Sequence, residues 1–157
     1  MRLLKLLPRA VRSRAFVAYG IATRAMTLGV RALVTDGERV LLVRHTYVQG
    51  WHIPGGGVER DETFEAALAK ELAEETHVRP TAEPVLHGLY RNTAYSRLDH
   101  VALYVVREFE EDGPFVPTHE IAECRFFALD AMPDTLHPGS ARRIGEILRG
   151  EPRVDYW

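Results

Sequence analysis

Short stretches of alternating apolar and polar residues recur along this chain, which is the pattern of strands with one buried face. The first, "VRALV" at residues 30–34, is followed by an Asp-Gly pair at 36–37, a hairpin signal, and then by "RVLLVRH" at 39–45. Further strands are expected over residues 85–92, 99–109 and 121–128. These stretches predict a sheet that is built from short strands.

Two segments carry a helical pattern. One helix is expected to begin near Thr63 and end near Thr76, because this segment is rich in Ala, Leu, Glu and Lys. A second should begin after Pro138 and end at Gly150. The glycines of "WHIPGGGVERDE", at residues 51–62, predict a loop before the first helix. Strands around a central helix, with another helix at the end, predict an α/β fold with a mixed sheet between helical layers.

The first predicted helix carries three glutamates close together, Glu71, Glu74 and Glu75. Like charges three or four residues apart on a helix repel each other by about 0.2–0.5 kcal/mol per pair. At about 100° per residue, Glu71 and Glu75 fall within about 20° of Phe64, beside the apolar stripe of the helix. An unpaired charge there is costly, and Mg²⁺ would relieve the cost because it binds carboxylate oxygens. The spacing alone leaves two alternatives open, a metal site and a solvated acidic patch.

Composition narrows the class of protein. The chain has 157 residues, which suits one domain with a real core, and a formal net charge of −2. With 46% hydrophobic and 27% charged residues, it resembles neither a disordered chain nor a globally basic nucleic-acid binder. The single cysteine, Cys124, excludes an intramolecular disulfide and a multi-cysteine zinc site. We therefore expect a cytoplasmic protein with Cys124 in or near the core and no nucleic-acid partner.

Residues 1–25 differ from the rest, because they carry six basic residues and no acidic one. Basic residues interrupt the apolar positions too often for a secretory signal, and no apolar run reaches the roughly 18 residues of a membrane span. The pattern predicts an amphipathic basic helix. We favour packing of this helix on the domain or on a second subunit, and the alternative is a role at a membrane surface or in attracting phosphate.

The glycine loop leads directly into the acidic helix, so its carbonyl oxygens are expected to face the glutamates. From Gly56 to Val78 the chain resembles the Nudix box, the signature of the Nudix hydrolases: Gly, five residues, Glu, seven residues, then Arg-Glu-aliphatic-any-Glu-Glu-any-Gly-aliphatic. The matching positions are Gly56, Glu62, Glu71, Leu72, Glu74, Glu75 and Val78. This resemblance implies a Nudix-type α/β/α sandwich with a mixed sheet over residues 26–157, preceded by the N-terminal basic helix.

The resemblance also implies an activity, the hydrolysis of a diphosphate linkage in a nucleoside diphosphate derivative with Mg²⁺ or Mn²⁺. The implied metal ligands are Glu71, Glu74, Glu75 and the carbonyl of Gly56, and the implied catalytic residues are Glu71, Glu75 and Glu120. Glu120 enters because many family members add an acidic residue from a loop before an aromatic strand. In "THEIAECRFF" that residue is Glu120, with Glu123 as the alternative.

Two positions depart from the box. Lys70 stands where the family has Arg, so it keeps the charge but loses the planar fork that holds a carboxylate. His77 replaces a helix-ending glycine, so the helix either ends in a strained left-handed residue or ends differently. Neither change removes an implied metal ligand. Glu62 and Lys70 are expected to support the site at the start of the helix.

Candidate substrate-binding residues lie on both sides of the box. Arg44 and Trp51 precede it, and Arg91 and Tyr95 follow it in a loop that is similar in position to a recognition loop of some family members. An aromatic ring would stack on a base and an arginine would bind phosphate. Core packing is the alternative for Trp51.

The matching glutamates favour a metal-dependent pyrophosphohydrolase that acts on a small nucleotide. The alternative is a Nudix-fold module that binds or senses a nucleotide without cleaving it, because of the changes at Lys70 and His77. The sequence leaves open which nucleotide is the substrate and whether the chain forms a homodimer.

Overall fold

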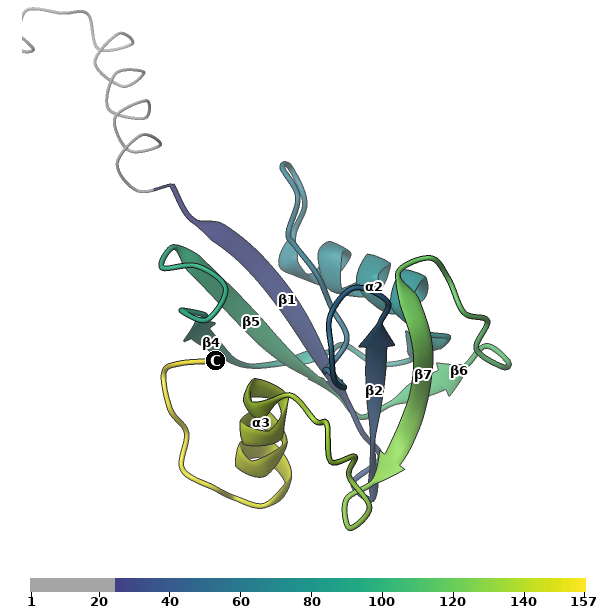
Figure 1. Ribbon diagram of the computed structural model, residues 1–157. Coiled ribbons are helices and arrows are strands. Elements are labelled where there is room, and N and C mark those ends of the chain that lie inside the picture. Colours follow the sequence, from purple (N-terminus) through teal and green to yellow (C-terminus); the bar gives the residue numbers. More distant parts are fainter. Residues whose placement is uncertain (1–24) are drawn as a thin grey trace, which may run out of the picture.

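The computed structural model describes residues 25–157, so the helix expected over 1–25 lies outside the described residues. The elements follow in the order β1 (Thr27–Val34), β2 (Arg39–His45), α2 (Phe64–Glu75), β3 (Val78–Pro80), β4 (Val85–Arg91), β5 (Asp99–Val106), β6 (Phe109–Glu111), β7 (Ile121–Ala128) and α3 (Pro138–Leu148) (Figure 1). No helix in this part of the chain is long and apolar enough to cross a membrane.

The strands form one mixed sheet and two antiparallel pairs. In the mixed sheet β1-β5-β4, the central strand β5 is parallel to β1 and antiparallel to β4. β2 pairs with β7, and β3 pairs with β6. The sequence pattern does not predict β3 and β6, because three residues are too few to show an alternation of apolar and polar positions.

The Asp-Gly turn forms as predicted, but the strands around it do not continue as a hairpin. Gly37 adopts a φ of 99°, and a single antiparallel bridge joins Thr35 to Val40. Beyond this bridge β1 pairs with β5 and β2 pairs with β7. Turn residues determine where the chain reverses, whereas the pairing of strands that are buried on both faces depends on the whole core.

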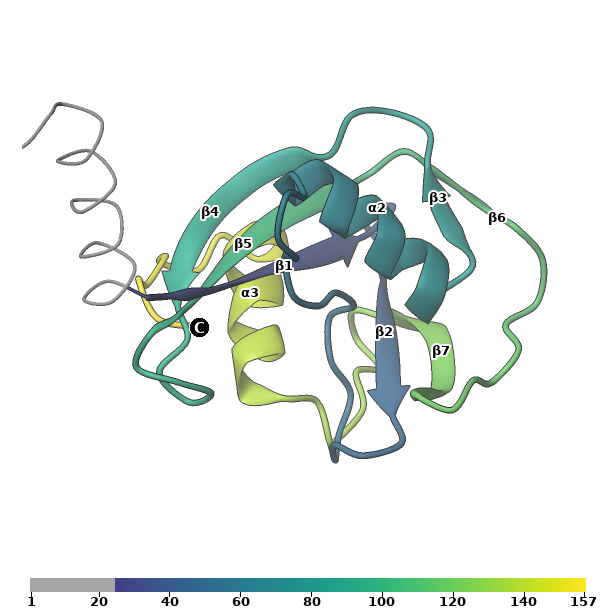
Figure 2. The same ribbon diagram turned by 90° about the horizontal axis from the view of Figure 1, so that it is seen from above.

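The two helices cover opposite faces of the mixed sheet (Figure 2). Val30, Ala32 and Val34 of β1 belong to the core that includes residues of α2. Leu33, which points to the other face of the strand, belongs to the core that includes Ile144 of α3. The prediction of a mixed sheet between helical layers is therefore confirmed.

Candidate functional site

The glycine loop lies along the edge of β1 that β5 does not occupy. The backbone N–H of Val30 donates to the carbonyl oxygen of Gly56 at 2.9 Å, and that of Ala32 donates to the carbonyl oxygen of Pro54 at 2.9 Å. Gly55 has a φ of 135°, and a Cβ there would lie 2.2 Å from the carbonyl oxygen of Val30. Only glycine allows this close approach, so β1 holds the loop backbone in one place.

The helix α2 points the three neighbouring glutamates of its last two turns in different directions. Glu75, its last residue, is 6% exposed and accepts a hydrogen bond of 2.7 Å from the backbone N–H of Gly55. Glu71, one turn earlier, is half-buried, and a Cβ on Gly56 would lie 2.4 Å from its carboxyl carbon. The missing side chain of Gly56 therefore leaves room for a carboxylate. Glu74 is exposed, so two glutamates face the loop and one faces solvent.

Burial raises the pKa of both inward-facing carboxyl groups. It raises the pKa of Glu75 to about 7, while the hydrogen bond from Gly55 and the charge of Arg31 act in the opposite direction. It also raises the pKa of Glu71, against the charge of Lys70. A buried carboxylate that lacks a cation is unfavourable, so a bound divalent cation would stabilise both. Their oxygen atoms are of the kind that Mg²⁺ and Mn²⁺ prefer.

Side chains alone do not complete a metal site. Within residues 25–157, no three His, Cys, Asp or Glu groups are close enough together to hold a metal ion. The other ligands would have to be backbone carbonyls, waters or substrate oxygens, which is common for Mg²⁺. The expected carbonyl is that of Gly56, whose oxygen already accepts the hydrogen bond from Val30. The carbonyl oxygen of the preceding Gly55 instead accepts a hydrogen bond from the guanidinium of Arg31.

Arg31 is the residue of this region that the sequence pattern did not single out. It lies in β1, half-buried, with fully buried residues on both sides. Its positive charge acts on the pKa of Glu71, Glu75 and His45, in each case as a smaller contribution than burial. The sequence did offer one indication of its role, because Arg31 is the single charged residue in a mostly apolar strand.

Glu62 and Lys70 lie together beside Glu71. The Nζ atom of Lys70 is 3.1 Å from Oε1 of Glu62 and 4.0 Å from Oε1 of Glu71. The carboxylate of Glu62 also accepts a hydrogen bond of 2.9 Å from the backbone N–H of Glu59. Lys70 therefore contacts Glu62 closely and Glu71 only loosely.

The helix ends without strain at the position where the family has glycine. Thr76 follows α2 in an extended conformation, with a φ of −133°. Its hydroxyl accepts a hydrogen bond of 3.0 Å from the backbone N–H of Val78. The one non-glycine residue with a positive φ in the described part of the chain is Asp61, at 65°. Of the two alternatives for His77, the structure shows the different helix end.

Glu120 and Glu123 have different surroundings. The backbone N–H of Thr46, just after β2, donates to the carbonyl oxygen of Glu120 at 2.8 Å. The charge of the exposed Glu120 side chain adds to the effect of burial in raising the pKa of Glu75. Glu123 instead forms an ion pair with Arg44 on the neighbouring strand. Glu120 is thus within electrostatic reach of the buried glutamate, whereas Glu123 is neutralised by Arg44.

A row of three histidines extends from Glu75 to the start of α3. The buried Nδ1 atom of His45 is 3.8 Å from Oε1 of Glu75 and has no hydrogen-bond partner among the described residues. The ring of His52 lies 5.7 Å from that of His45 and stacks on His137 at 4.8 Å. Burial lowers the pKa of His45 to about 4, and it also lowers the pKa of His52 and His137. The three histidines are therefore neutral near pH 7, so the row that begins beside Glu75 consists of polar but uncharged groups.

The candidate substrate residues lie apart from the glutamates. Trp51 is 5% exposed and its ring packs edge-on against Phe127 in the core, at 4.7 Å. Arg44 is held in its ion pair. Arg91 ends β4 and Tyr95 lies in the following loop, with β5 between β4 and β1. Trp51 and Arg44 are thus engaged in core packing and an ion pair, and Arg91 and Tyr95 lie on the far side of β5 from the glycine loop.

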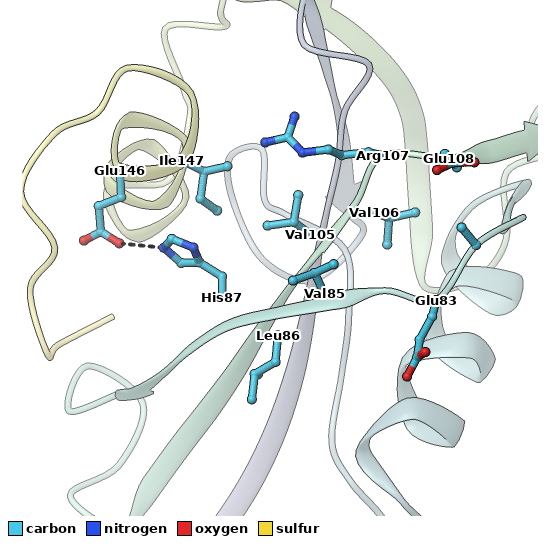
Figure 3. Close-up of a pocket in the computed structure, with 11 residues that line it drawn as sticks. Glu83, Val85, Leu86, His87, Val105, Val106, Arg107, Glu108, Glu146 and Ile147 are labelled. Atoms are coloured by element: carbon cyan, nitrogen blue, oxygen red, sulfur yellow. Dashed lines mark ion pairs between the residues drawn. The ribbon is translucent and has the colours of Figure 1, made fainter.

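Two further features lie outside this site. A cavity of about 450 Å³ lies between β4, the end of β5 and α3, where His87 and Glu146 face each other at 3.8 Å (Figure 3). None of the glutamates of the glycine-loop site lines it. Burial raises the pKa of the Cys124 thiol to about 12, so this thiol stays protonated and fits the expected structural role.

The chain resembles known proteins over most of its length. The family model of the NUDIX domain matches residues 25–146. A MutT-like protein of Streptomyces ambofaciens is 39% identical over 61 residues, which are 39% of either chain. Diphosphoinositol polyphosphate phosphohydrolase 2 of Rattus norvegicus is 32% identical over 100 residues, 64% of this chain and 55% of that protein. The chain thus spans less than two thirds of the length of these two relatives.

The fold is also similar to that of solved structures. The crystal structure of a MutT NUDIX hydrolase from Burkholderia pseudomallei superposes with a TM-score of 0.67 at 21% sequence identity. The superposition covers 77% of this chain and 97% of the other. At this identity the likeness concerns the fold.

Proposed function

The chain belongs to the Nudix family, and from this membership we propose that it hydrolyses a diphosphate linkage in a nucleoside diphosphate derivative. The observation that supports this proposal best is the placement of Glu71 and Glu75 against the backbone of Gly55 and Gly56. Two carboxyl groups with raised pKa values beside a fixed glycine loop are suited to bind a divalent cation.

We propose Mg²⁺ or Mn²⁺ as the cofactor, with Glu71 and Glu75 as direct ligands and the exposed Glu74 as a ligand through water, because no three such groups of the described residues lie close enough together to hold one ion directly. A backbone carbonyl of the loop, from Gly56 or Gly55, would add a ligand. When bound, such a cation contacts diphosphate oxygens, neutralises charge and lowers the pKa of an attacking water.

The chain's own residues would prepare this site in three ways. The hydrogen bond from Gly55 holds the carboxylate of Glu75 in place, and Lys70 attracts that of Glu71. We propose Glu120 as a distal base or ligand, because its charge contributes to the raised pKa of Glu75. The row of histidines begins at His45, beside Glu75, and adds no positive charge there near pH 7.

The test is release of phosphate and nucleotide from a panel of diphosphate compounds, with and without Mg²⁺. The panel contains nucleoside triphosphates, ADP-ribose, nucleotide sugars, dinucleoside polyphosphates and a diphosphoinositol polyphosphate. We expect metal-dependent cleavage of at least one compound, lost in Glu71→Gln and retained in the control Glu108→Gln, which removes an exposed charge elsewhere. Binding without cleavage of any compound would contradict the hydrolase and support a binding module.

Location and assembly are further proposals. The single, partly buried Cys124 agrees with a reducing compartment, so we propose that the protein is cytoplasmic. We also propose that residues 26–157 form one Nudix domain that acts on a small nucleotide. Light scattering of the full chain, and of the chain without residues 1–25, would show whether it is a homodimer and whether the N-terminal segment is needed for it.

A further inference from the structure

Arg31 has a fixed position, and its side chain forms no ion pair with residues 25–157. Its strand lies between β5 and the glycine loop, paired with Leu103 on one side and hydrogen-bonded through Val30 and Ala32 on the other. Its guanidinium donates to the carbonyl oxygen of Gly55, the residue whose N–H holds Glu75. A rigid element therefore holds the guanidinium at the same residue of the glycine loop that holds the carboxylate of Glu75.

The charge of Arg31 has no direct counter-ion among residues 25–157. Nearby arginines differ, since Arg39 forms ion pairs with Asp36 and Glu111 and Arg44 forms one with Glu123. The hydrogen bond to Gly55 uses one of the five N–H groups of a guanidinium, and the others have no protein partner in this part of the chain. A half-buried arginine in this state is suited to receive an anion.

A diphosphate needs such a group in this site. The ligand brings negative charge to a place that already holds Glu71 and Glu75, and bound cations neutralise only part of the total. Lys70 is already engaged with Glu62 at 3.1 Å. Arg31, by contrast, has no counter-ion among residues 25–157 and is held at the carbonyl oxygen of Gly55, so its charge is available to the diphosphate.

We propose that Arg31 is a phosphate-binding residue of this site, which holds the Gly55 carbonyl with one N–H group and a phosphate of the substrate with others. This inference rests on the proposed function, because it names a contact to the same diphosphate. Arginine suits the task because its planar fork binds two phosphate oxygens at once, which lysine does not reproduce.

The role makes two predictions of opposite sign. Loss of the guanidinium removes contacts to the phosphate, so a diphosphate ligand should bind more weakly. The same loss removes a positive charge beside Glu71 and Glu75, so Mg²⁺ alone should bind as tightly as before or more tightly. If Arg31 only held the loop in place, its removal would displace the Gly55 backbone and weaken the binding of both.

The experiment is isothermal titration calorimetry of the full chain with Mg²⁺ alone, and then with a non-hydrolysable methylene-bridged ADP analogue in saturating Mg²⁺. The variants are Arg31→Gln, Arg31→Lys and the control Arg79→Gln, which removes an exposed arginine that pairs with Glu110. We expect the analogue to bind roughly 10- to 100-fold more weakly to Arg31→Gln, as for loss of a charge-assisted hydrogen bond, and a few-fold more weakly to Arg31→Lys. Arg79→Gln should bind like the parent protein.

Each other outcome has a defined meaning. Unchanged affinity of Arg31→Gln for the analogue, or a parallel loss of Mg²⁺ affinity, would overturn the inference while the proposed function stands. If Arg31→Gln does not fold, Arg31→Lys decides, because it keeps the charge and loses the fork. A parent protein that binds neither Mg²⁺ nor the analogue would overturn the proposed function itself.

Discussion

Replacement of Glu75 by glutamine should make the metal-free protein more stable while it removes a proposed metal ligand. The side chain of Glu75 is 8% exposed, and its close polar contacts are the N–H of Gly55 at 2.7 Å and Nδ1 of His45 at 3.8 Å. Glutamine keeps an oxygen that accepts the hydrogen bond from Gly55. The substitution therefore removes the cost of a buried charge and retains the main contact.

The magnitude follows from the pKa. Burial raises the pKa of Glu75 from 4.5 to about 7, so the folded state favours the protonated acid relative to the unfolded chain. The stabilisation from this preference is complete below the unfolded value of 4.5 and is lost as pH rises through the folded value of about 7. At about 1.4 kcal/mol per pKa unit, the ionisable Glu75 lowers the free energy of unfolding, relative to a neutral side chain, by about 1 kcal/mol near pH 5 and about 3 kcal/mol near pH 8.

The assay is urea unfolding in EDTA near pH 5 and near pH 8, with the free energy of unfolding extrapolated to water. We expect Glu75→Gln to exceed the parent protein by about 1 kcal/mol at the lower pH and about 3 kcal/mol at the higher. Glu74→Gln is the matched control, because it removes the exposed neighbouring carboxylate and should change stability by less than about 0.5 kcal/mol.

Two results would refute this reasoning. One is a gain that does not grow with pH, and the other is a loss of stability near pH 8. Added Mg²⁺ should stabilise the parent protein by mass action and Glu75→Gln much less, which would connect the buried charge to the metal. Equal stabilisation of both proteins by Mg²⁺ would mean that Glu75 is not a ligand.

Three other substitutions test separate parts of the structure. Gly55→Ala should lower the free energy of unfolding in urea by more than about 2 kcal/mol, because the new Cβ would lie 2.2 Å from a backbone oxygen of β1. A change within about 0.5 kcal/mol would contradict the loop geometry. Lys70→Arg should raise kcat/KM about fivefold for the best substrate of the panel, because the arginine fork would hold the carboxylate of Glu71 more firmly than a lysine 4.0 Å away. An unchanged kcat/KM would show that this contact does not limit the reaction. Glu146→Ala should lower the free energy of unfolding by about 3–5 kcal/mol, measured by thermal or urea unfolding, because it leaves the fully buried Arg143 without its ion-pair partner at 2.7 Å. Replacement of both residues by apolar residues of similar size should lower it far less.

Much of the candidate site was predictable because it lies in one continuous segment. The helical period places Glu71 and Glu75 beside the apolar stripe and Glu74 away from it, and the burial of these residues follows that pattern. The glycines before the helix were also visible in the sequence. What the spacing could not show is that the N–H of Gly55 binds Glu75, because the angle between a loop and a helix depends on the strand that both pack against.

The strand pairing and the role of Arg31 required the tertiary structure. A period of two in the sequence shows which face of a strand is buried, but it does not show which strand lies beside it. The turn at Asp36 and Gly37 therefore suggested a hairpin, whereas β1 pairs with β5, which begins more than sixty residues later. That pairing leaves the other edge of β1 to the glycine loop.

The sequence by itself thus determined the longer strands, both helices and the identity of the acidic residues of the central helix, since each depends on neighbours within a few positions. Only the tertiary structure decided that Trp51 is buried in the core and that Arg31 hydrogen-bonds to Gly55, the residue that also binds Glu75. The physical reason is that such contacts join residues far apart in the chain. They form because the complete core has a lower free energy with those partners than with the nearer ones.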